Sequence, residues 1–320
     1  MTRTMATKPV DLPRGSRPRA QWASSPERGS LTLLRMMTFV SLRLGRPVGR
    51  FILYFIALYF FLFAPTARRH SREYLRRALG RTPAARDRFR QVFNFASVIL
   101  DRLYLVNERY DLFEVSIEGE ELMREGLLRG NGAFLMGAHI GSFEIVSALG
   151  RRRPGLRVAM AMYEENARKV TAMLKAVNPA NRAEVIALGQ IEAMLRIRER
   201  LDEGVFVGIL GDRSFGGEPG LLVDFLGRPA LFPLGPMRAA AVLRRPVYFM
   251  LGVYKGGNRY RVVFEELADF SNTCSADREA AVEAAIRRYA ALLEKYCRNE
   301  PCNWFNFFDF WPGTGGQEAG

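Results

Sequence analysis

Residues that build metal or thiol sites are scarce in this chain, which has 320 residues but only 2 His and 3 Cys. Cys274, Cys297 and Cys302 are odd in number and widely spaced, as expected of reduced thiols and not of a disulfide scaffold. With no Cys cluster beside either His, we expect no metal site. The chain also lacks a G-x-S-x-G elbow, an H-E-x-x-H helix, a P-loop and a G-x-G-x-x-G turn after a strand. We therefore expect no bound cofactor.

Acidic residues are scarce only at the N-terminal end, and this decides what the net charge of +14 means. Residues 1–90 carry 19 Lys and Arg against 4 Asp and Glu, a net of +15. Residues 91–320 carry 28 against 29, a net of −1. Residues 91–320 therefore do not form a basic domain. Nucleic-acid binding is not expected, because the Arg-rich part of the chain surrounds an apolar segment.

That apolar segment, Phe51–Ala64, is fourteen consecutive apolar residues with Arg on both sides. As a helix at about 1.5 Å per residue it spans roughly 21 Å, less than a bilayer core of about 30 Å. Three interpretations stay open: a buried core helix, a spanning helix, and an anchor that dips into one leaflet while Arg side chains bind anionic headgroups. We divide the N-terminal part into a disordered basic tail, 1–35, and a membrane-anchoring helical segment, 36–82.

The rest of the chain alternates between strand and helix patterns, which predicts an α/β fold with a mostly parallel sheet flanked by helices. Residues 83–312 form the predicted catalytic domain, with a helical pattern over 84–110 and a loose tail at 313–320. The predicted strands are Val115–Glu118, Ala133–Gly137, Arg157–Met162, Glu184–Leu188, Val205–Leu210, Pro246–Tyr254 and Arg259–Leu267. The predicted helices are Gly119–Arg129, Phe143–Gly150, Glu165–Val177, Gln190–Asp202, Leu234–Leu243 and Asp277–Arg298. A turn at 255–258 predicts that the last two strands are antiparallel.

His139 is the first candidate for chemistry, because it follows a buried strand and precedes a helix that has Glu144 in its first turn. Ligands of open α/β sheets gather at the carboxyl ends of strands. A carboxylate one turn away can orient the imidazole, which then takes a proton from an attacking hydroxyl. Gly141 would let the backbone pass close to a substrate. The alternative is a buried His that caps a helix.

Gly211-Asp212-Arg213 also follows a strong strand candidate, so we expect it to share a cleft with His139. Arg213 can neutralise a phosphate, and Asp212 can hold the Arg or accept a hydrogen bond from a hydroxyl. A structural salt bridge is the alternative. Downstream, the segment 225–236 with Arg228 is predicted to be a loop that leads into a helix.

Together these segments resemble the bacterial lipid A biosynthesis late acyltransferases, a family within the glycerolipid acyltransferase group. The matching segments are HIGSFE at 139–144, which fits the H-x-x-x-x-[DE] element, GDR at 211–213, FLGRP at 225–229 and NWFNFFDFW at 303–311. Their order and spacing agree from about residue 36 to 312. Ser142-Phe143 stands where the commonest motif has Asn-Trp. The C-terminal segment resembles a branch that acts outside standard lipid A assembly, for example on another glycolipid or an aryl polyene lipid.

The resemblance implies transfer of a fatty acyl group from acyl carrier protein or coenzyme A to a hydroxyl of a membrane lipid, without an acyl-enzyme. His139 would be the base and Glu144 its partner in a dyad. The substrate contacts it implies are Gly141, Ser142, Arg168, Asp212, Arg213 and Arg228. The protein would sit at the cytoplasmic face of a bacterial inner membrane, against its anionic surface. Two other functions stay open: a lipid or thioester hydrolase that uses the same dyad, and a non-catalytic lipid-binding protein.

Overall fold

The computed structural model describes Phe39 and residues 41–152, 156–178, 184–189, 191–213 and 218–311. The predicted tails 1–35 and 313–320 therefore lie outside the described residues. The centre of the fold is a seven-stranded sheet in the order β1-β9-β8-β2-β5-β3-β4. Five strands, β8, β2, β5, β3 and β4, are mutually parallel, and the pair β9 and β1 runs in the opposite direction.

All seven predicted strands are present, and the α/β prediction is confirmed. Their bounds are β1 (Glu114–Glu118), β2 (Phe134–Gly137), β3 (Val158–Tyr163), β4 (Glu184–Leu188), β5 (Phe206–Leu210), β8 (Pro246–Tyr254) and β9 (Arg259–Asp269). The predicted turn at 255–258 does join an antiparallel pair, β8 and β9. Every residue of β2 and β8 is buried, as expected for strands covered by helices on both faces.

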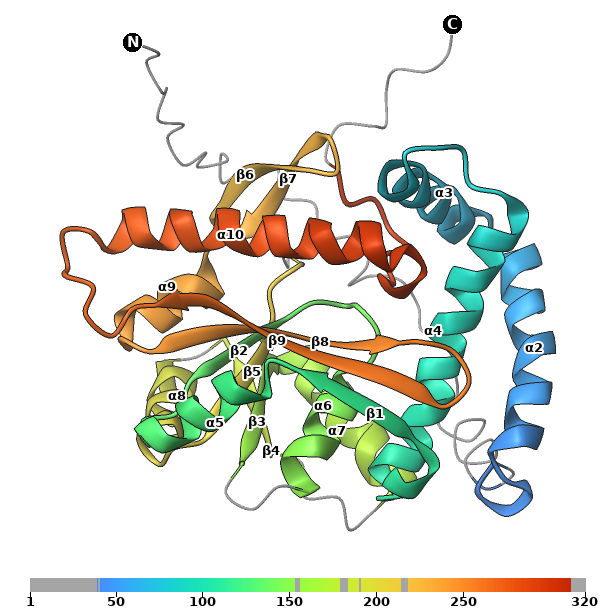
Figure 1. The fold of residues 1–320 in the computed structure, drawn as a ribbon, viewed down its shortest axis with the longest axis horizontal. Helices are drawn as coiled ribbons and strands as arrows, with labels where there is room; N and C mark the ends of the chain where they lie inside the picture. The colour runs from blue at the N-terminus through green and yellow to red at the C-terminus, as the bar shows by residue number, and fades with distance from the viewer. Residues whose placement is uncertain are drawn as a thin grey trace, which may run out of the picture.

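The predicted helices are also present, with ends that shift by one or two residues in most cases. They are α4 (Ala85–Val106), α5 (Glu120–Arg129), α6 (Phe143–Arg152), α7 (Glu164–Val177), α8 (Ile191–Asp202), α9 (Gly235–Val242) and α10 (Arg278–Asn299). Two short 3-10 turns, η1 (Tyr110–Leu112) and η2 (Pro301–Asn303), complete them. Helix α10 crosses one face of the sheet, and α5, α6 and α7 cover the other (Figure 1).

Two hydrophobic cores follow from the alternation of side chains along each strand. In β2, Phe134 and Met136 belong to the core under α8, α9 and α10, and Leu135 belongs to the core under α4, α5, α6 and α7. Both cores are contiguous and rich in aromatic and branched residues. The sheet is therefore held rigidly, and the loops at its strand ends are anchored on a fixed frame.

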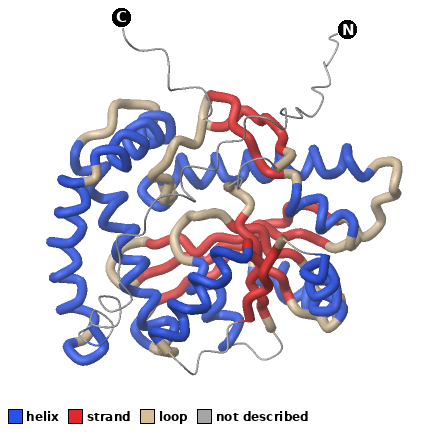
Figure 2. Tube along the Cα trace, turned by 180° about the vertical axis from the view of Figure 1, so that it is seen from behind, coloured by secondary structure: helices blue, strands red, loops and turns tan. Residues whose placement is uncertain are grey.

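The segment 225–236, predicted to be a loop that leads into a helix, does lead into α9, but most of it is strand and not loop. Residues 220–233 form an antiparallel pair, β6 (Gly220–Phe225) and β7 (Arg228–Pro233), which stands apart from the main sheet (Figure 2). Leu226 and Gly227 both have positive φ, 52° and 78°, which is the turn geometry that matches the twist of a hairpin. The two prolines in β7 concealed the strand in the sequence.

The anchoring segment is helical as predicted, in two helices, α2 (Arg46–Phe63) and α3 (Pro65–Leu79). Helix α2 is the outermost element and packs along α4 (Figure 1). It is the one helix in the described part of the chain that is long and apolar enough to cross a membrane, with a mean hydropathy of 1.5. Only 17% of that window is buried, so the interpretation of this segment as a buried core helix is wrong.

Candidate active site

His139 lies two residues beyond β2, in the middle of the sheet, and its partner is Asp212 from the neighbouring strand. Nδ1 of His139 is 2.8 Å from Oδ1 of Asp212, and the backbone N–H of His139 donates to Oδ2 at 3.1 Å. The register of β2 and β5 explains why these side chains lie together. Gly137 pairs with Leu210 across the two parallel strands, and His139 and Asp212 each follow two positions later. The predicted shared location of His139 and Asp212 is confirmed.

Asp212 is fully buried, whereas the side chain of His139 is 30% exposed. The indole of Trp304 donates to Oδ2 of Asp212 at 2.9 Å, so this carboxylate receives three hydrogen bonds from two residues. In this structure the Asp212 carboxylate has no exposed surface, and its hydrogen bonds go to His139 and Trp304. Its predicted contact with substrate stays a prediction.

The predicted contact between His139 and Glu144 is not made. Among the described residues, no hydrogen bond or ion pair joins these two side chains; Oε1 of Glu144 instead lies 2.6 Å from Nε of Arg102, on α4. Its other oxygen accepts a hydrogen bond from Ser142 Oγ at 3.2 Å. The spacing in the sequence correctly placed a carboxylate one turn into α6, but it could not show the cation that α4 brings to it.

Gly141 and Ser142, predicted to contact substrate, have a structural part in the loop after His139. Gly141 has φ of 61°, and a side chain there would collide with the carbonyl oxygen of Gly252. Ser142 is 1% exposed, and its Oγ accepts a hydrogen bond from the N–H of Ile145 at 3.3 Å, which caps the first turn of α6. Both residues hold the loop in one conformation, so they determine where His139 points.

The three predicted arginines lie in different places. Arg213 is next to Asp212; its Nη2 donates to Phe305 O at 3.1 Å and its guanidinium lies 4.8 Å from the ring centre of Phe308. Arg168 is exposed on α7, and within the described ranges no hydrogen bond or ion pair joins it to the other predicted residues. Arg228 lies on the β6–β7 hairpin and pairs with Glu73 at 3.8 Å. Only Arg213 belongs to the His139 cluster.

The C-terminal segment, which entered the sequence analysis only through its resemblance, completes the site. Trp304 forms an antiparallel bridge with Ile140, and Phe305 N–H donates to His139 O at 2.9 Å. The Trp304 ring is 1% exposed and packs against an aromatic cluster of Tyr74, Phe225, Phe310 and Trp311. A buried indole N–H requires an acceptor. That requirement, together with the abundance of aromatics at 303–311, was the signal available in the sequence.

Burial favours the neutral form of His139, and the nearby charges act in both directions. Burial lowers the pKa of His139, the positive charge of Arg213 lowers it further, and Asp212 acts in the opposite direction. Burial opposes ionisation of Asp212, but the His139 charge, the His139 and Trp304 hydrogen bonds and Arg213 hold its pKa well below the usual range. Burial lowers the pKa of Arg213 to about 10. At neutral pH the site therefore contains a carboxylate, a guanidinium and an uncharged imidazole.

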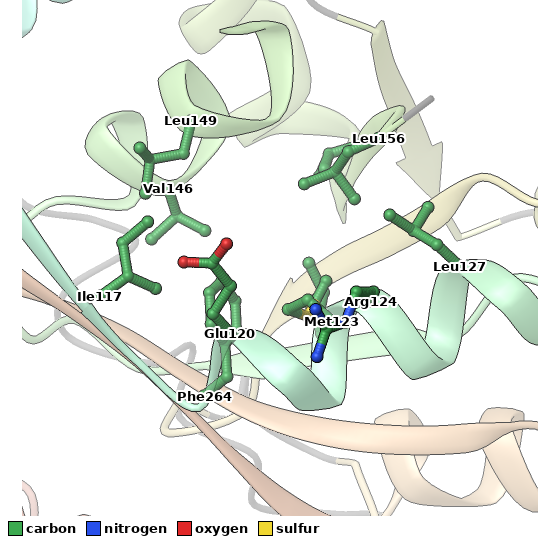
Figure 3. Close-up of a pocket in the computed structure, with 11 residues that line it drawn as sticks. Ile117, Glu120, Met123, Arg124, Leu127, Val146, Leu149, Leu156 and Phe264 are labelled. Carbon is green, nitrogen blue, oxygen red and sulfur yellow. The ribbon is translucent and has the colours of Figure 1, made fainter. Parts of the chain in front are cut away.

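A cavity of about 280 Å³ lies between α5 and α6, on the face of the sheet that these two helices cover (Figure 3). Val146 and Leu149 of α6 face Met123 and Leu127 of α5 across it, with Glu120 and Arg124 also on its wall. None of the predicted site residues lines it. The described residues contain no group of three His, Cys, Asp or Glu side chains that could hold a metal ion.

A buried carboxylate that is hydrogen-bonded to a partly exposed neutral imidazole is an arrangement that general bases use. The comparison with protein families places this arrangement in context. The bacterial lipid A biosynthesis acyltransferase family matches residues 22–311. The chain belongs to this family. A comparison with curated proteins finds no match. Family membership makes the chain an acyltransferase, with an acyl donor and a lipid acceptor, and the predicted family and enzyme class are confirmed.

Proposed function

We propose that this acyltransferase moves a fatty acyl chain from a thioester of acyl carrier protein or coenzyme A to a hydroxyl of a membrane lipid or glycolipid. The observation that carries the proposal is the pairing of the partly exposed His139 with the buried Asp212 at 2.8 Å. An ionised Asp212 accepts a hydrogen bond from Nδ1–H, which leaves Nε2 as the unprotonated ring nitrogen. A hydroxyl that approaches the exposed side of His139 therefore meets a base.

In the proposed reaction, Nε2 of His139 takes the proton of the acceptor hydroxyl while the hydroxyl oxygen bonds to the thioester carbonyl carbon. The tetrahedral intermediate then collapses, the carbon–sulfur bond breaks, and the imidazolium returns the proton to the leaving thiolate. Asp212 stabilises the imidazolium throughout. No acyl-enzyme forms, because both substrates react in one complex.

The test is a transfer assay with purified protein, a labelled acyl thioester and lipid acceptors. We expect label in a lipid ester with the wild type and none with His139→Ala. Free fatty acid without acylated lipid would mean that water is the acceptor, and the hydrolase interpretation would hold instead. Mass spectrometry of lipids from cells with and without the protein then identifies the acceptor as the lipid that loses one acyl chain.

The pH dependence provides a second test. A general base must be neutral, and the pKa of His139 is lowered, so kcat/KM should persist below the usual His pKa of about 6.5 and fall only as pH drops through the lowered value. Arg213→Met removes a charge that lowers this pKa, so the acid limb should move to higher pH. Arg168→Met is the control that leaves the limb in place. A limb that moves down, or does not move, in Arg213→Met contradicts the assignment.

We propose that Glu144 and Arg102 act as one unit that positions the acceptor hydroxyl beside His139. Their ion pair is largely shielded, with side chains 17% and 24% exposed. Glu144→Gln and Arg102→Gln should each lower transfer by about 10²-fold, because small displacements of a reacting group are costly. The double variant should lose no more than either single variant. Losses that multiply would show independent roles, and Glu165→Gln, from an exposed pair with Lys169, is the control.

We also propose that the enzyme acts at the cytoplasmic face of a bacterial inner membrane, where α2 and the basic N-terminal region meet anionic lipid. Family membership and the apolar helix α2 support this location. The amino-acid sequence also supports this location, because the excess positive charge lies in the first 90 residues, next to the proposed anionic surface.

A further inference from the structure

Helix α2 is apolar except for Arg46 and Arg50 in its first turns, although only a narrow stripe of it is covered. The buried residues are Gly49, Leu53 and Ala57, spaced four apart on one side. The exposed side is almost entirely apolar, made of Val48, Phe51, Ile52, Tyr54, Phe55, Leu58, Tyr59, Phe60, Leu62 and Phe63. We call these ten residues the outer face of α2. A surface helix in contact with water normally carries polar residues there, and a continuous apolar face of this kind marks an interaction site.

The opposite side of α2 packs against α4 and is joined to it by a buried ion pair. Arg46 Nε lies 2.7 Å from Oδ1 of Asp101 on α4, with the two side chains 10% and 0% exposed. Tyr260 OH donates to the other oxygen of Asp101 at 2.8 Å. One turn further, Arg50 donates to Tyr254 OH at 2.7 Å. Separating α2 from α4 would leave a buried carboxylate without its cation, which is strongly unfavourable.

The two helices run antiparallel, and α4 follows α2 over its whole length. Gly49 lies beside Leu100, and Phe61 contacts Phe89 near the start of α4. Tyr54, half-exposed at the border of the outer face, contacts Phe93 between them. That end of α4 is strongly polar, with Arg86, Asp87, Arg88 and Arg90 in its first turns. The guanidinium of Arg88 lies 5.8 Å from the ring centre of Phe61. A spanning α2 that kept this packing would carry these charges to hydrocarbon depth.

Positive charge is arranged around the outer face. Arg43 before α2 is exposed, and so are Arg69, Arg72 and Arg76 on α3, where Glu73 is the single acidic residue. Arg46 and Arg50, which the sequence placed with the other flanking arginines, turn inward to the body. The exposed arginines next to an apolar aromatic face match the headgroup and upper acyl region of an anionic bilayer.

We propose that α2 lies in the plane of the membrane and does not cross it, with its outer face in one leaflet of an anionic bilayer and its inner side still on α4. The proposal rests on the membrane location given above, but not on acyl transfer. In this arrangement one turn of α4 connects the lipid surface with the reaction site. Asp101 pairs with Arg46 of α2, and the next residue, Arg102, pairs with Glu144.

The experiment measures the depth of three outer-face positions in the full chain, reconstituted into phosphatidylethanolamine–phosphatidylglycerol vesicles. Phe51→Cys, Phe55→Cys and Leu62→Cys are made singly in a Cys274→Ser, Cys302→Ser background and labelled with a fluorophore; Cys297 is buried. Quenching is compared between lipids that carry a nitroxide near the headgroup and lipids that carry it deep in the acyl chain. Positions 51 and 62 are separated by about 16 Å along a helix axis, so a spanning helix would give unequal depths.

A helix in the membrane plane should give the same ratio of shallow to deep quenching at all three positions, within about twofold, with the shallow nitroxide more effective. A Phe55 label much deeper than the labels at Phe51 and Leu62 would overturn the proposal. Absence of quenching at all three would also overturn it, since another partner would then cover the face. A separate Cys302→Ser protein, which keeps Cys274 in the exposed loop before α10 and has no outer-face cysteine, is labelled at Cys274 as the unquenched control. Vesicles that still transfer acyl chains while showing graded depths would refute this inference alone and leave the proposed function standing.

Discussion

Asp212→Asn should lower acyl transfer by about 10³-fold or more while the protein stays folded. In the proposed mechanism the carboxylate accepts a hydrogen bond from Nδ1–H of His139, 2.8 Å away, and so leaves Nε2 free to act as the base. An amide in the same place presents an N–H₂ group to Nδ1, which moves the ring proton to Nε2 and removes the base; the comparable change in a serine protease triad costs about 10⁴-fold. The measurement is kcat with saturating thioester, beside the unfolding temperature in detergent.

Asp224→Asn is the matched control for this variant, because Asp224 is exposed on the β6–β7 hairpin. It should keep full activity. If Asp212→Asn retained activity within tenfold of the wild type, Asp212 would not be the orienting partner. The role would then return to Glu144, as the H-x-x-x-x-E spacing had predicted.

Trp304→Ala should lower the free energy of unfolding by about 3–5 kcal/mol, as expected for removing a large buried aromatic side chain. Trp304 is 1% exposed, and its ring joins Tyr74, Phe225 and Phe310 in one cluster. The C-terminal segment would lose its anchor, and with it the bridge from Trp304 to Ile140. Chemical denaturation in detergent measures the loss.

Trp304→Phe separates packing from the hydrogen bond, because it keeps an aromatic ring but removes the donor to Asp212. Activity should fall about tenfold, since a hydrogen bond to a buried charge contributes about 1.5–3 kcal/mol. Trp311→Phe is the control: it removes a buried indole N–H that donates to Phe225 O at 3.2 Å and not to the site. Equal activity losses in the two Trp→Phe variants would show that Trp304 acts only through packing.

Strand and helix positions could be predicted because they depend on local patterns. The buried run at β5 and the helical spacing in α10 each reflect which neighbours along the chain are apolar, and the structure confirms both. The hairpin β6–β7 was missed because its two prolines resemble a loop. Helix α2 was recognised as an apolar helix, but its packing against α4 was not, because that contact joins Arg46 to a residue 55 positions away.

The sequence by itself determined the fold class, which follows from periodicity along the chain, and it indicated the family through the resemblance of its motifs. It also made His139 the candidate base, which stays a prediction. It also placed Asp212 at the same sheet edge as His139, since both follow parallel strands. Only the tertiary structure decided which carboxylate orients the imidazole. Asp212 does so because parallel register brings it level with His139, while α4 delivers Arg102 to Glu144 and the C-terminal segment delivers Trp304 to Asp212. The partners in these contacts are tens of positions apart in the sequence, up to 92 for Asp212 and Trp304, and only packing brings them together.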